Sequence, residues 1–373
     1  MAIPFNIPYC TGKEMEHLGD VLARGRFVGG GAYSKRCAAW IEEATGCAKA
    51  ILVPSGTAAL DMMLLLADLH PGDEVIVPSF TFSSTANAVV LRGGVPVFVD
   101  IRPDTLNMDE RAIEAAITPR TKVILPVHYA GAACDMDAIE VLAKRHGLLV
   151  LEDAAQCILS YWRGRHLGSL GAMGILSFHE TKNVQCGEGG ALLVNDPRFL
   201  ARAEIVMEKG TDRSKFLKGE VDKYGWVDVG SSYLVNEMTA AFLWAQLEAA
   251  TSIVARRVAL WEAYHAALEP FERKGRIRRP VVLDEARHNA HVYPILFGTP
   301  EDRDSAMAAL KDRGLQCLAH YLPLHSSAAG KRFGRSVPER LPVSERVAGT
   351  MLRLPLYMGL DVDEAIAILR ATL

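Results

Sequence analysis

Short, unbroken runs of apolar residues recur along the chain from about residue 50 to residue 195. A strand that is buried on both faces of a sheet has this continuous hydrophobicity, whereas a strand with one face in solvent alternates between apolar and polar residues. A further apolar run, AMGILSF (172–178), ends shortly before Lys182. We predict six buried strands: AILVP (50–54), EVIVP (74–78), VPVFVD (95–100), KVILPV (122–127), LLVLED (148–153) and GALLVN (190–195).

Segments with helical periodicity lie between several of these runs. Examples are DERAIEAAI (109–117) and MDAIEVLAKRHG (136–147), and the second closes with Gly147, a usual helix C-cap. The alternation of strands and helices predicts an α/β fold with an open, mainly parallel sheet that is covered by helices. Ligands of such sheets bind at the carboxyl ends of the strands.

The C-terminal part of the chain has a different texture. A long helical stretch covers residues 235–268, and HVYPILF (291–297) and QCLAHYLPL (316–324) are strand candidates in a smaller α+β unit. Since domains contain about 100 to 200 residues, 373 residues suffice for one large and one small domain. We predict a large domain at residues 1–250 and a smaller C-terminal domain at residues 251–373.

The charge composition argues against several classes of partner. The 41 lysines and arginines nearly balance the 44 aspartates and glutamates, and the formal net charge is −3. No overall field draws such a chain to nucleic acid or to a membrane surface. The N-terminus MAIPFNIPYC lacks a charged head followed by an apolar run, and Asp61 and Asp68 interrupt the most apolar helical stretch. We therefore expect neither a secretion signal nor a membrane span.

Cysteine usage favours a reducing compartment. The seven cysteines are scattered without a CxxC pair, which suits the cytoplasm better than a disulfide framework. No spacing of histidine and cysteine matches a metal site, so we expect no metal.

Three features at predicted strand ends bear chemical groups. SGTAAL (55–60) follows a strand and opens a helix, so its amides and hydroxyls form either an anion site suited to phosphate or an ordinary N-cap. Asp153 ends another strand and either faces a ligand or caps a turn. Lys182 lies in a Gly-rich turn, where a lysine is commonly solvated but reacts with carbonyl groups when its amine is partly neutral.

The combination of these features matches what pyridoxal phosphate requires. This cofactor needs an anchor for its phosphate, a carboxylate partner for its ring nitrogen and a lysine that bonds to its aldehyde. A charge pair about 4 Å apart, at an effective dielectric constant of about 20, contributes ~4 kcal/mol or about three pK units. Such a pair is sufficient to keep the ring nitrogen protonated.

The ordered motifs SGTAAL, PSFTFSSTANAV, EDAAQ, SFHETKN and GEGGALL resemble those of the DegT/DnrJ/EryC1/StrS family of sugar-nucleotide aminotransferases. The resemblance extends through nearly the whole chain and includes VHYAG, SSYL and HYLPLH. It implies the aspartate aminotransferase fold, pyridoxal 5'-phosphate as the cofactor, and a homodimer whose active sites are built from two chains.

The resemblance also implies roles for individual residues. Lys182 would bond covalently to the cofactor, and Asp153 would partner the pyridinium nitrogen. Phe82 would stack on the cofactor ring, and Gln156 would touch its phenolic oxygen. The residues implied around the phosphate are Gly56, Thr57 and Ser177, with Ser55 close by.

The motif GSSYLVNEM departs from the family pattern. Many family members have an Asn and an Arg where Ser232 and Leu234 stand here. In the family that Asn reaches the phosphate of the neighbouring subunit's cofactor. Ser232 would make this contact with a shorter side chain or through water.

Candidate contacts to the substrate come from two segments. The charged segment EKGTDRSKFLKGEVDKY (208–224) is typical of a solvated loop or of a site for the diphosphate of a sugar nucleotide, and we select Arg213 and Lys223 from it. The segment HYLPLH offers Tyr321 and His325 as sugar contacts, along with His320. Histidines in such a segment are more often core or surface residues.

Within the family, SFHETKN and VDKYGWVDVGSSYL are most similar to the enterobacterial-type enzymes that aminate C4 of dTDP-4-dehydro-6-deoxy-D-glucose. This similarity implies L-glutamate as the amino donor and dTDP-4-amino-4,6-dideoxy-D-galactose as the product. The alternatives are amination at C3 of a 3-keto sugar nucleotide, or a catalytically silent regulator that binds the cofactor. Relatives that dehydrate C3 have histidine in place of Lys182. A Rossmann-type dehydrogenase is disfavoured because no GxGxxG follows the early strands.

Overall fold

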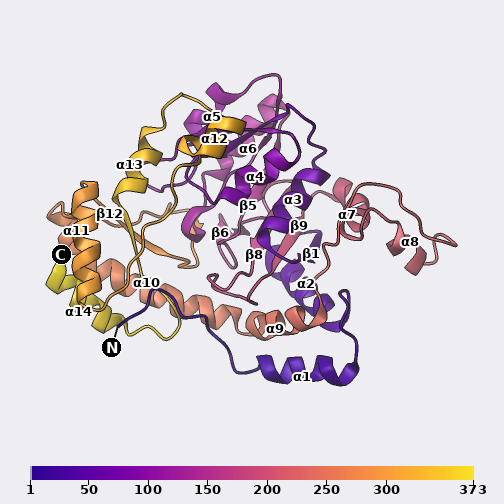
Figure 1. The fold of residues 1–373 in the computed structure, drawn as a ribbon, viewed down its shortest axis with the longest axis horizontal. Helices are drawn as coiled ribbons and strands as arrows, with labels where there is room; N and C mark the ends of the chain where they lie inside the picture. The colour runs from indigo at the N-terminus through magenta and orange to yellow at the C-terminus, as the bar shows by residue number, and fades with distance from the viewer. Residues whose placement is uncertain (1) are drawn as a thin grey trace.

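An eight-stranded sheet forms the centre of the computed structural model, which describes residues 2–373 (Figure 1). The strand order is β1-β9-β8-β5-β4-β2-β3-β13, and all neighbours are parallel except the pairs that β9 makes with β1 and β8. All six predicted strands and the predicted α/β class are confirmed. The strands of this sheet are Lys49–Val53 (β1), Glu74–Pro78 (β2), Val95–Val99 (β3), Thr121–Ile124 (β4), Leu149–Asp153 (β5), Met173–Ser177 (β8), Gly190–Val194 (β9) and Arg335–Ser336 (β13).

Both faces of this sheet are buried, as the continuous apolar runs predict. Ile76 and Ile124 belong to one core cluster, whereas their neighbours Val75 and Val123 belong to another. This division follows from the alternation of side chains along a strand. Helices cover the two faces, and the helices that precede residue 220 are Glu14–Arg24 (α1), Ala32–Thr45 (α2), Gly56–Leu66 (α3), Ser83–Leu91 (α4), Glu110–Ala116 (α5), Met136–His146 (α6), Leu200–Met207 (α7) and Arg213–Leu217 (α8).

The helix signals in the sequence are also borne out. Gly147 caps α6 in the left-handed conformation with φ 65°, and its N–H donates to the carbonyls of Ala143 and Lys144. The stretch predicted at residues 235–268 forms two helices, Glu237–Glu248 (α9) and Ala250–Arg273 (α10), bent by 58°. Within residues 2–373, no single helix is long and apolar enough to cross a membrane, although this bent pair reaches the necessary length and composition together.

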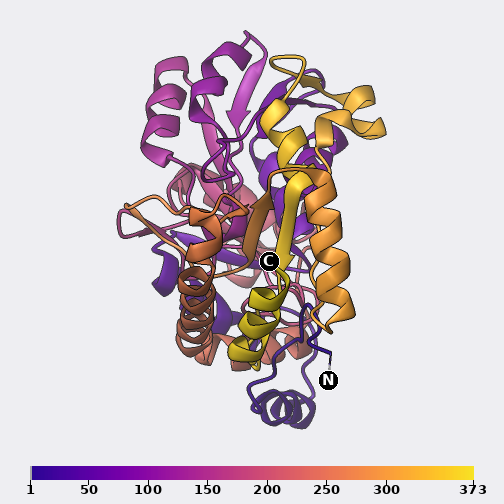
Figure 2. The ribbon, with the colours of Figure 1, turned by 90° about the vertical axis from the view of Figure 1, so that its left-hand side faces the viewer.

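The C-terminal region builds a second core around an antiparallel sheet. Its strands are Ile277–Arg278 (β10), Tyr293–Phe297 (β12) and Met351–Leu354 (β14). Figure 2 shows α10, Pro300–Asp312 (α11) and Val362–Thr372 (α14) beside this sheet. The N-terminal segment reaches the same region, because Ile3 bridges Leu315 and packs in this core.

The remaining elements are short. A three-stranded sheet contains Tyr161–Trp162 (β6), Arg165–His166 (β7) and Ala286–Arg287 (β11). The other helices are Ala328–Phe333 (α12) and Pro342–Thr350 (α13), with 3-10 turns at Tyr129–Gly131 (η1), Pro197–Phe199 (η2) and Leu324–Ser326 (η3).

Two C-terminal segments lie against the main sheet. The strand predicted at QCLAHYLPL (316–324) is wrong, because the structure gives this segment a single isolated bridge, between Leu318 and Arg353. Pro323 has no N–H for a ladder, and the amide of Leu324 donates to Ser79 O on the main sheet (2.9 Å). Farther along the chain, β13 extends the main sheet beside β3. The domain division near residue 250 stays a prediction.

Candidate active site

A cavity of about 460 Å³ lies at the carboxyl ends of β5 and β8. These strands are parallel neighbours, so the residues that end or follow them meet at one edge of the sheet. The C-terminal region closes the opposite side through α10, β14 and the irregular segment after Leu315. Predicted residues on the cavity wall are Ser55, Gly56, Thr57, Phe82, Asp153, Gln156, Ser177, Lys182 and Tyr321.

Lys182 lies in the loop that joins β8 to the antiparallel strand β9. Its backbone N–H donates to His179 O (2.8 Å), and the next residue, Asn183, is buried and donates to Asn289 O (2.7 Å). These bonds fix the backbone on both sides of the lysine. Burial lowers the pKa of Lys182 to about 8, because loss of water disfavours the charged amine more than Asp153 favours it. About a tenth of the amine is therefore neutral at pH 7 and about half at pH 8.

Asp153 is the last residue of β5 and is buried. Its carboxylate accepts hydrogen bonds from the Thr85 hydroxyl (2.8 Å) and from the N–H of Ala155 (3.2 Å). Burial raises the pKa of Asp153, and these two donors and Lys182 oppose the shift. A positively charged ligand group at this carboxylate would stabilise its ionised form.

Glu152, the preceding residue, faces the other side of the sheet. Its carboxylate accepts hydrogen bonds from the N–H groups of Gly168 (2.8 Å), Leu170 (2.7 Å) and Gly171 (2.6 Å). Nε2 of His128 also lies 2.9 Å from it, while Nδ1 of His128 accepts from the Cys134 N–H. The pKa of Glu152 is lowered because these donors outweigh burial. Glu152 thus ties a loop to β5 and is absent from the cavity wall.

The start of α3 forms an anion cradle. Ser55 is its N-cap and accepts from the N–H of Ala58 (3.0 Å), so the N-cap interpretation is correct for this side chain. The amides of Gly56 and Thr57 belong to the first turn, which has no carbonyl within the helix to bond. A Cβ on Gly56 would lie 2.9 Å from Cβ of Ser177, and one on Gly190 would lie 2.6 Å from N of Gly56. Glycine at both positions brings the helix start against β8 and β9.

Aromatic and amide groups form the adjoining wall. Phe82 precedes α4 and is 57% exposed, with its ring centroid 6.3 Å from that of Tyr321. Gln156 donates to the Tyr321 hydroxyl (3.1 Å) and accepts from the N–H of Ala130 (2.7 Å). His320 stacks on Tyr321 at 3.7 Å. A flat ligand can therefore contact Phe82 while Gln156 and Tyr321 lie at its edge.

Four predicted contacts lie outside the cavity of their own chain. Arg213 pairs with Glu208 (2.7 Å) at the start of the short helix α8, and Lys223 follows that helix. Ser232 is exposed and bridges the backbone of Glu208. Nδ1 of His325 lies 2.7 Å from the Ser79 hydroxyl, so this histidine ties η3 to the main sheet.

Sequence reasoning missed other residues on the cavity wall. Thr85 belongs to the quoted motif PSFTFSSTANAV, yet its role as a donor to Asp153 has no local sequence signal. Arg257, His291 and Arg353 come from distant C-terminal segments. Only the packing of α10 and β14 against the strand ends brings them to the cavity.

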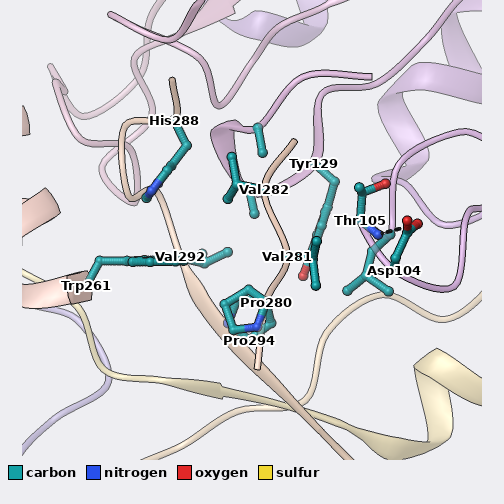
Figure 3. A pocket seen from close by; sticks show the side chains of 13 residues that line it. Asp104, Thr105, Tyr129, Trp261, Pro280, Val281, Val282, His288, Val292 and Pro294 are labelled. Carbon is teal, nitrogen blue, oxygen red and sulfur yellow. Dashed lines mark hydrogen bonds between the residues drawn. The ribbon is translucent and has the colours of Figure 1, made fainter. Parts of the chain in front are cut away.

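A second cavity holds about 20 Å³ and lies between Tyr129, Trp261 and Val292 (Figure 3). Its wall is mostly apolar, with Pro280, Pro294 and three valines around it (Figure 3). This volume has room for about one water molecule. Over residues 2–373, no group of three or more His, Cys, Asp or Glu side chains is placed to hold a metal ion.

The main cavity fits pyridoxal phosphate on the chemistry of its wall. The cradle at the start of α3 supplies amides, hydroxyls and the positive end of a helix dipole for a phosphate. Asp153 is a buried carboxylate that a protonated ring nitrogen would pair, and Lys182 is a partly neutral amine on the same wall. The volume is within the usual range of about 300 to 1,000 Å³ for small-molecule sites.

Comparison with known proteins gives the same family. Residues 8–372 match the model of the DegT/DnrJ/EryC1/StrS aminotransferase family. The spore coat polysaccharide biosynthesis protein SpsC of Bacillus subtilis is 33% identical over 99% of this chain and 96% of its own length. The aminotransferase TlmJ of Streptoalloteichus hindustanus is 30% identical, with a TM-score of 0.91 over 100% of this chain and 99% of TlmJ.

A solved structure also links the family to the cofactor. Spr1654 of Streptococcus pneumoniae, determined in its PLP form, is 25% identical to this chain, with a TM-score of 0.89 over 100% of both chains. This similarity covers the strand ends, the cradle and the C-terminal region that together enclose the cavity. The chain belongs to the DegT/DnrJ/EryC1/StrS aminotransferase family, and it is a pyridoxal-phosphate-dependent aminotransferase.

Proposed function

We propose that this enzyme transfers the amino group of L-glutamate to a nucleotide-linked 4-keto-6-deoxyhexose. The specific substrate that we propose is dTDP-4-dehydro-6-deoxy-D-glucose, with dTDP-4-amino-4,6-dideoxy-D-galactose as the product. The observation that carries the transamination is the presence of Lys182 and Asp153 on one cavity wall beside an anion cradle. The sugar class is supported by the motifs SFHETKN and VDKYGWVDVGSSYL and by a relative named for polysaccharide biosynthesis.

The chain's own residues would divide the chemistry between them. Pyridoxal phosphate, when bound, supplies a ring that withdraws electrons from the donor's Cα–H bond. Asp153 would hold a proton on the ring nitrogen, and Thr85 orients this carboxylate. Lys182, as a neutral amine, would take the proton from Cα of glutamate and later deliver one to C4 of the sugar. Phe82 and Tyr321 would shield the reacting atoms from water.

We further propose that the active enzyme is a homodimer. The segment at residues 208–230, here called the arm, contains α8 and projects away from the main sheet (Figure 1). Trp226 in the arm is 81% exposed and Leu217 is 68% exposed, beside the exposed side chains of Val227 and Val229. Such a group of exposed large apolar residues is typical of a surface that another chain covers.

A partner at the arm would also explain the predicted residues that lie outside the cavity. Arg213 and Lys223 belong to the arm, and Ser232 lies two residues beyond its end. We propose that Ser232 reaches the phosphate region of the partner's cavity, and that Arg213 and Lys223 contact the diphosphate of the partner's sugar nucleotide. Tyr321 would contact the sugar within its own chain.

The compartment that we propose is the cytoplasm. All seven cysteines are free thiols, and five of them are buried. Free thiols persist where glutathione and thioredoxin keep the surroundings reducing.

Incubation with a panel of keto-sugar nucleotides tests the proposed reaction. The purified enzyme, L-glutamate and each 4-keto or 3-keto sugar nucleotide would be combined, and the products identified by NMR. We expect turnover with dTDP-4-dehydro-6-deoxy-D-glucose and an axial amine at C4. Turnover only with a 3-keto sugar would support the C3 alternative, and bound cofactor without any turnover would support the regulator.

A further inference from the structure

Arg353 is a partly buried cavity residue, and among residues 2–373 no carboxylate pairs with its charge. It lies on β14, and its Nη2 donates to the carbonyl of Ala319 (2.9 Å). Its guanidinium carbon lies 4.9 Å from the ring centroid of Phe5. In the part of the chain that the structure describes, its Nε is buried without a hydrogen-bond partner. Burial lowers the pKa of Arg353, with only Tyr129 and Tyr321 opposing the shift.

Lys182 and Arg257, which also line the cavity, are engaged differently from Arg353. Lys182 interacts electrostatically with Asp153. Arg257 uses Nε and Nη2 to donate to the carbonyls of Ala290 (3.1 Å) and His291 (2.7 Å), so it holds the backbone that precedes β12. A guanidinium whose Nε–H is buried without an acceptor is unfavourable unless an anion pairs with it. The donors of Arg353 therefore indicate a site for an anionic group of a ligand.

The position of Arg353 identifies the class of anion. Arg353 lies close enough to Lys182 to lower the pKa of its amine, and it also acts on His320. An amino acid carries its α-carboxylate on the carbon that exchanges a proton with the lysine. The reacting carbon of a sugar nucleotide has hydroxyl-bearing neighbours, and its diphosphate lies beyond the sugar ring. The anion expected beside Lys182 is therefore a carboxylate, which a planar guanidinium binds with two parallel hydrogen bonds.

We propose that Arg353 binds the α-carboxylate of the amino donor and positions its Cα–H for Lys182. This inference rests on the transamination in the proposed function but is independent of the sugar. Backbone hydrogen bonds pair Arg353 with Leu318 in both directions (2.8 and 3.2 Å). Because the chain continues from Leu318 to Tyr321, the carboxylate site and the aromatic wall are held as one unit.

The test separates the two half-reactions of the holoenzyme. Arg353→Met removes the charge, Arg353→Lys keeps the charge without the planar fork, and Arg332→Met is a matched control on the exposed surface of α12. Binding of glutarate, which has carboxylates but no amine, is measured by calorimetry. Single-turnover absorbance then follows reaction of the cofactor with L-glutamate. The reverse experiment follows reaction of the amino form of the cofactor with the sugar nucleotide.

Loss of charge-assisted hydrogen bonds predicts that Arg353→Met raises the Kd of glutarate and the apparent Kd of L-glutamate about 10- to 100-fold. Arg353→Lys should lie between this variant and the wild type. The sugar half-reaction should change less than about threefold, and Arg332→Met should match the wild type. Unchanged binding of glutarate and L-glutamate, or equal loss in both half-reactions, would overturn the proposal. The donor measurements contain no sugar, so failure of the proposed sugar substrate would leave their outcome intact.

Discussion

The cavity holds two ionisable side chains away from solvent, whereas the arm exposes charged and large apolar side chains to solvent. In the cavity, Lys182 and Asp153 are removed from water. Burial lowers the pKa of Lys182 and raises the pKa of Asp153, so it favours the neutral form of both groups. In the arm, Trp226 is 81% exposed and Lys218 is an exposed residue paired with Glu204 (2.7 Å). A single chain therefore brings the buried lysine, the buried carboxylate and the anion cradle to one cavity. In the proposed dimer, the arm would acquire its role when a second chain covers it.

Removal of the lysine is the largest expected disturbance of the cavity. Lys182→Ala should lower the rate of amino transfer by about 10²- to 10⁴-fold or more, because both the covalent attachment and the proton carrier are lost. The fold should persist, since the loop retains its anchor from Asn183 to Asn289. Stopped-flow absorbance and circular dichroism measure the two effects. Full turnover by Lys182→Ala would show that Lys182 is not the lysine that attaches the cofactor and transfers the proton.

The two adjacent carboxylates of β5 provide the next test. Asp153→Asn should lower the rate about 10²- to 10³-fold, because loss of a pairing of up to ~4 kcal/mol leaves the ring nitrogen less protonated. Glu152→Gln is the matched control. It should lower the free energy of unfolding by about 1 to 3 kcal/mol, because the new side-chain NH₂ group is a donor and would leave backbone N–H donors without an acceptor. Its rate per folded molecule should stay close to that of the wild type. A large loss of rate in Glu152→Gln but not in Asp153→Asn would show that Asp153 is not the carboxylate that pairs with the ring nitrogen.

The arm should control assembly more than chemistry. Trp226→Ala removes the most exposed large apolar side chain of the arm and should raise the dimer Kd about 10- to 100-fold, as for a buried aromatic at an interface. Analytical ultracentrifugation measures this Kd, and activity should recover at high protein concentration. Val141→Ala, at an exposed position of α6, is the control. An unchanged Kd for Trp226→Ala would remove the arm from the interface.

The pH dependence distinguishes the buried lysine from an exposed one. In the cofactor-free enzyme, the pKa of Lys182 of about 8 predicts that the rate of cofactor attachment rises with pH and levels off above about pH 8. The sign follows because only the neutral amine attacks the aldehyde, so the rate falls about tenfold per pH unit below that value. A stopped-flow pH series measures it. A rate that still rises about tenfold between pH 8 and pH 9 would indicate an unshifted, solvated lysine, whose pKa is about 10.4.

The smallest expected effects belong to the basic residues of the arm. Arg213→Ala and Lys223→Ala should each raise the KM of the sugar nucleotide about two- to fivefold, because exposed ion pairs contribute about 1 kcal/mol or less. Added salt should raise the KM of the wild type toward the values of the variants, because it screens the ion pairs. Steady-state kinetics at two salt concentrations measures both. If KM is the same in all three proteins, neither side chain contacts the diphosphate.

The parts of the fold that the sequence predicts best are those with local physical causes. Continuous apolar runs mark the strands, and Gly147 marks a helix end because its backbone adopts positive φ. The error at QCLAHYLPL has a tertiary cause. Cys317 packs in the C-terminal core and Tyr321 lines the cavity, while the amide of Leu324 donates to O of Ser79, the residue after β2. Apolar composition alone cannot distinguish such a segment from a strand.

The residues of the site also divide into those with a local signal in the sequence and those that only the tertiary fold brings to the cavity. Asp153 ends β5 and Lys182 lies in the loop after β8, so their positions along the chain indicate the cavity. Arg353 has no such signal, because Leu318, Phe5 and the reacting lysine come together only in the folded chain. His325 shows that a place in the motif is not sufficient. It lies near Tyr321 in the sequence, yet its ring points to Ser79 and not into the cavity.

Borohydride reduction of the holoenzyme, followed by peptide mapping with mass spectrometry, tests the central claim most directly. Reduction makes the bond between the cofactor and its lysine permanent. We expect loss of the visible absorption and a single modified peptide whose label is on Lys182. A label on any other lysine, or reduction without a label on the protein, would contradict that claim.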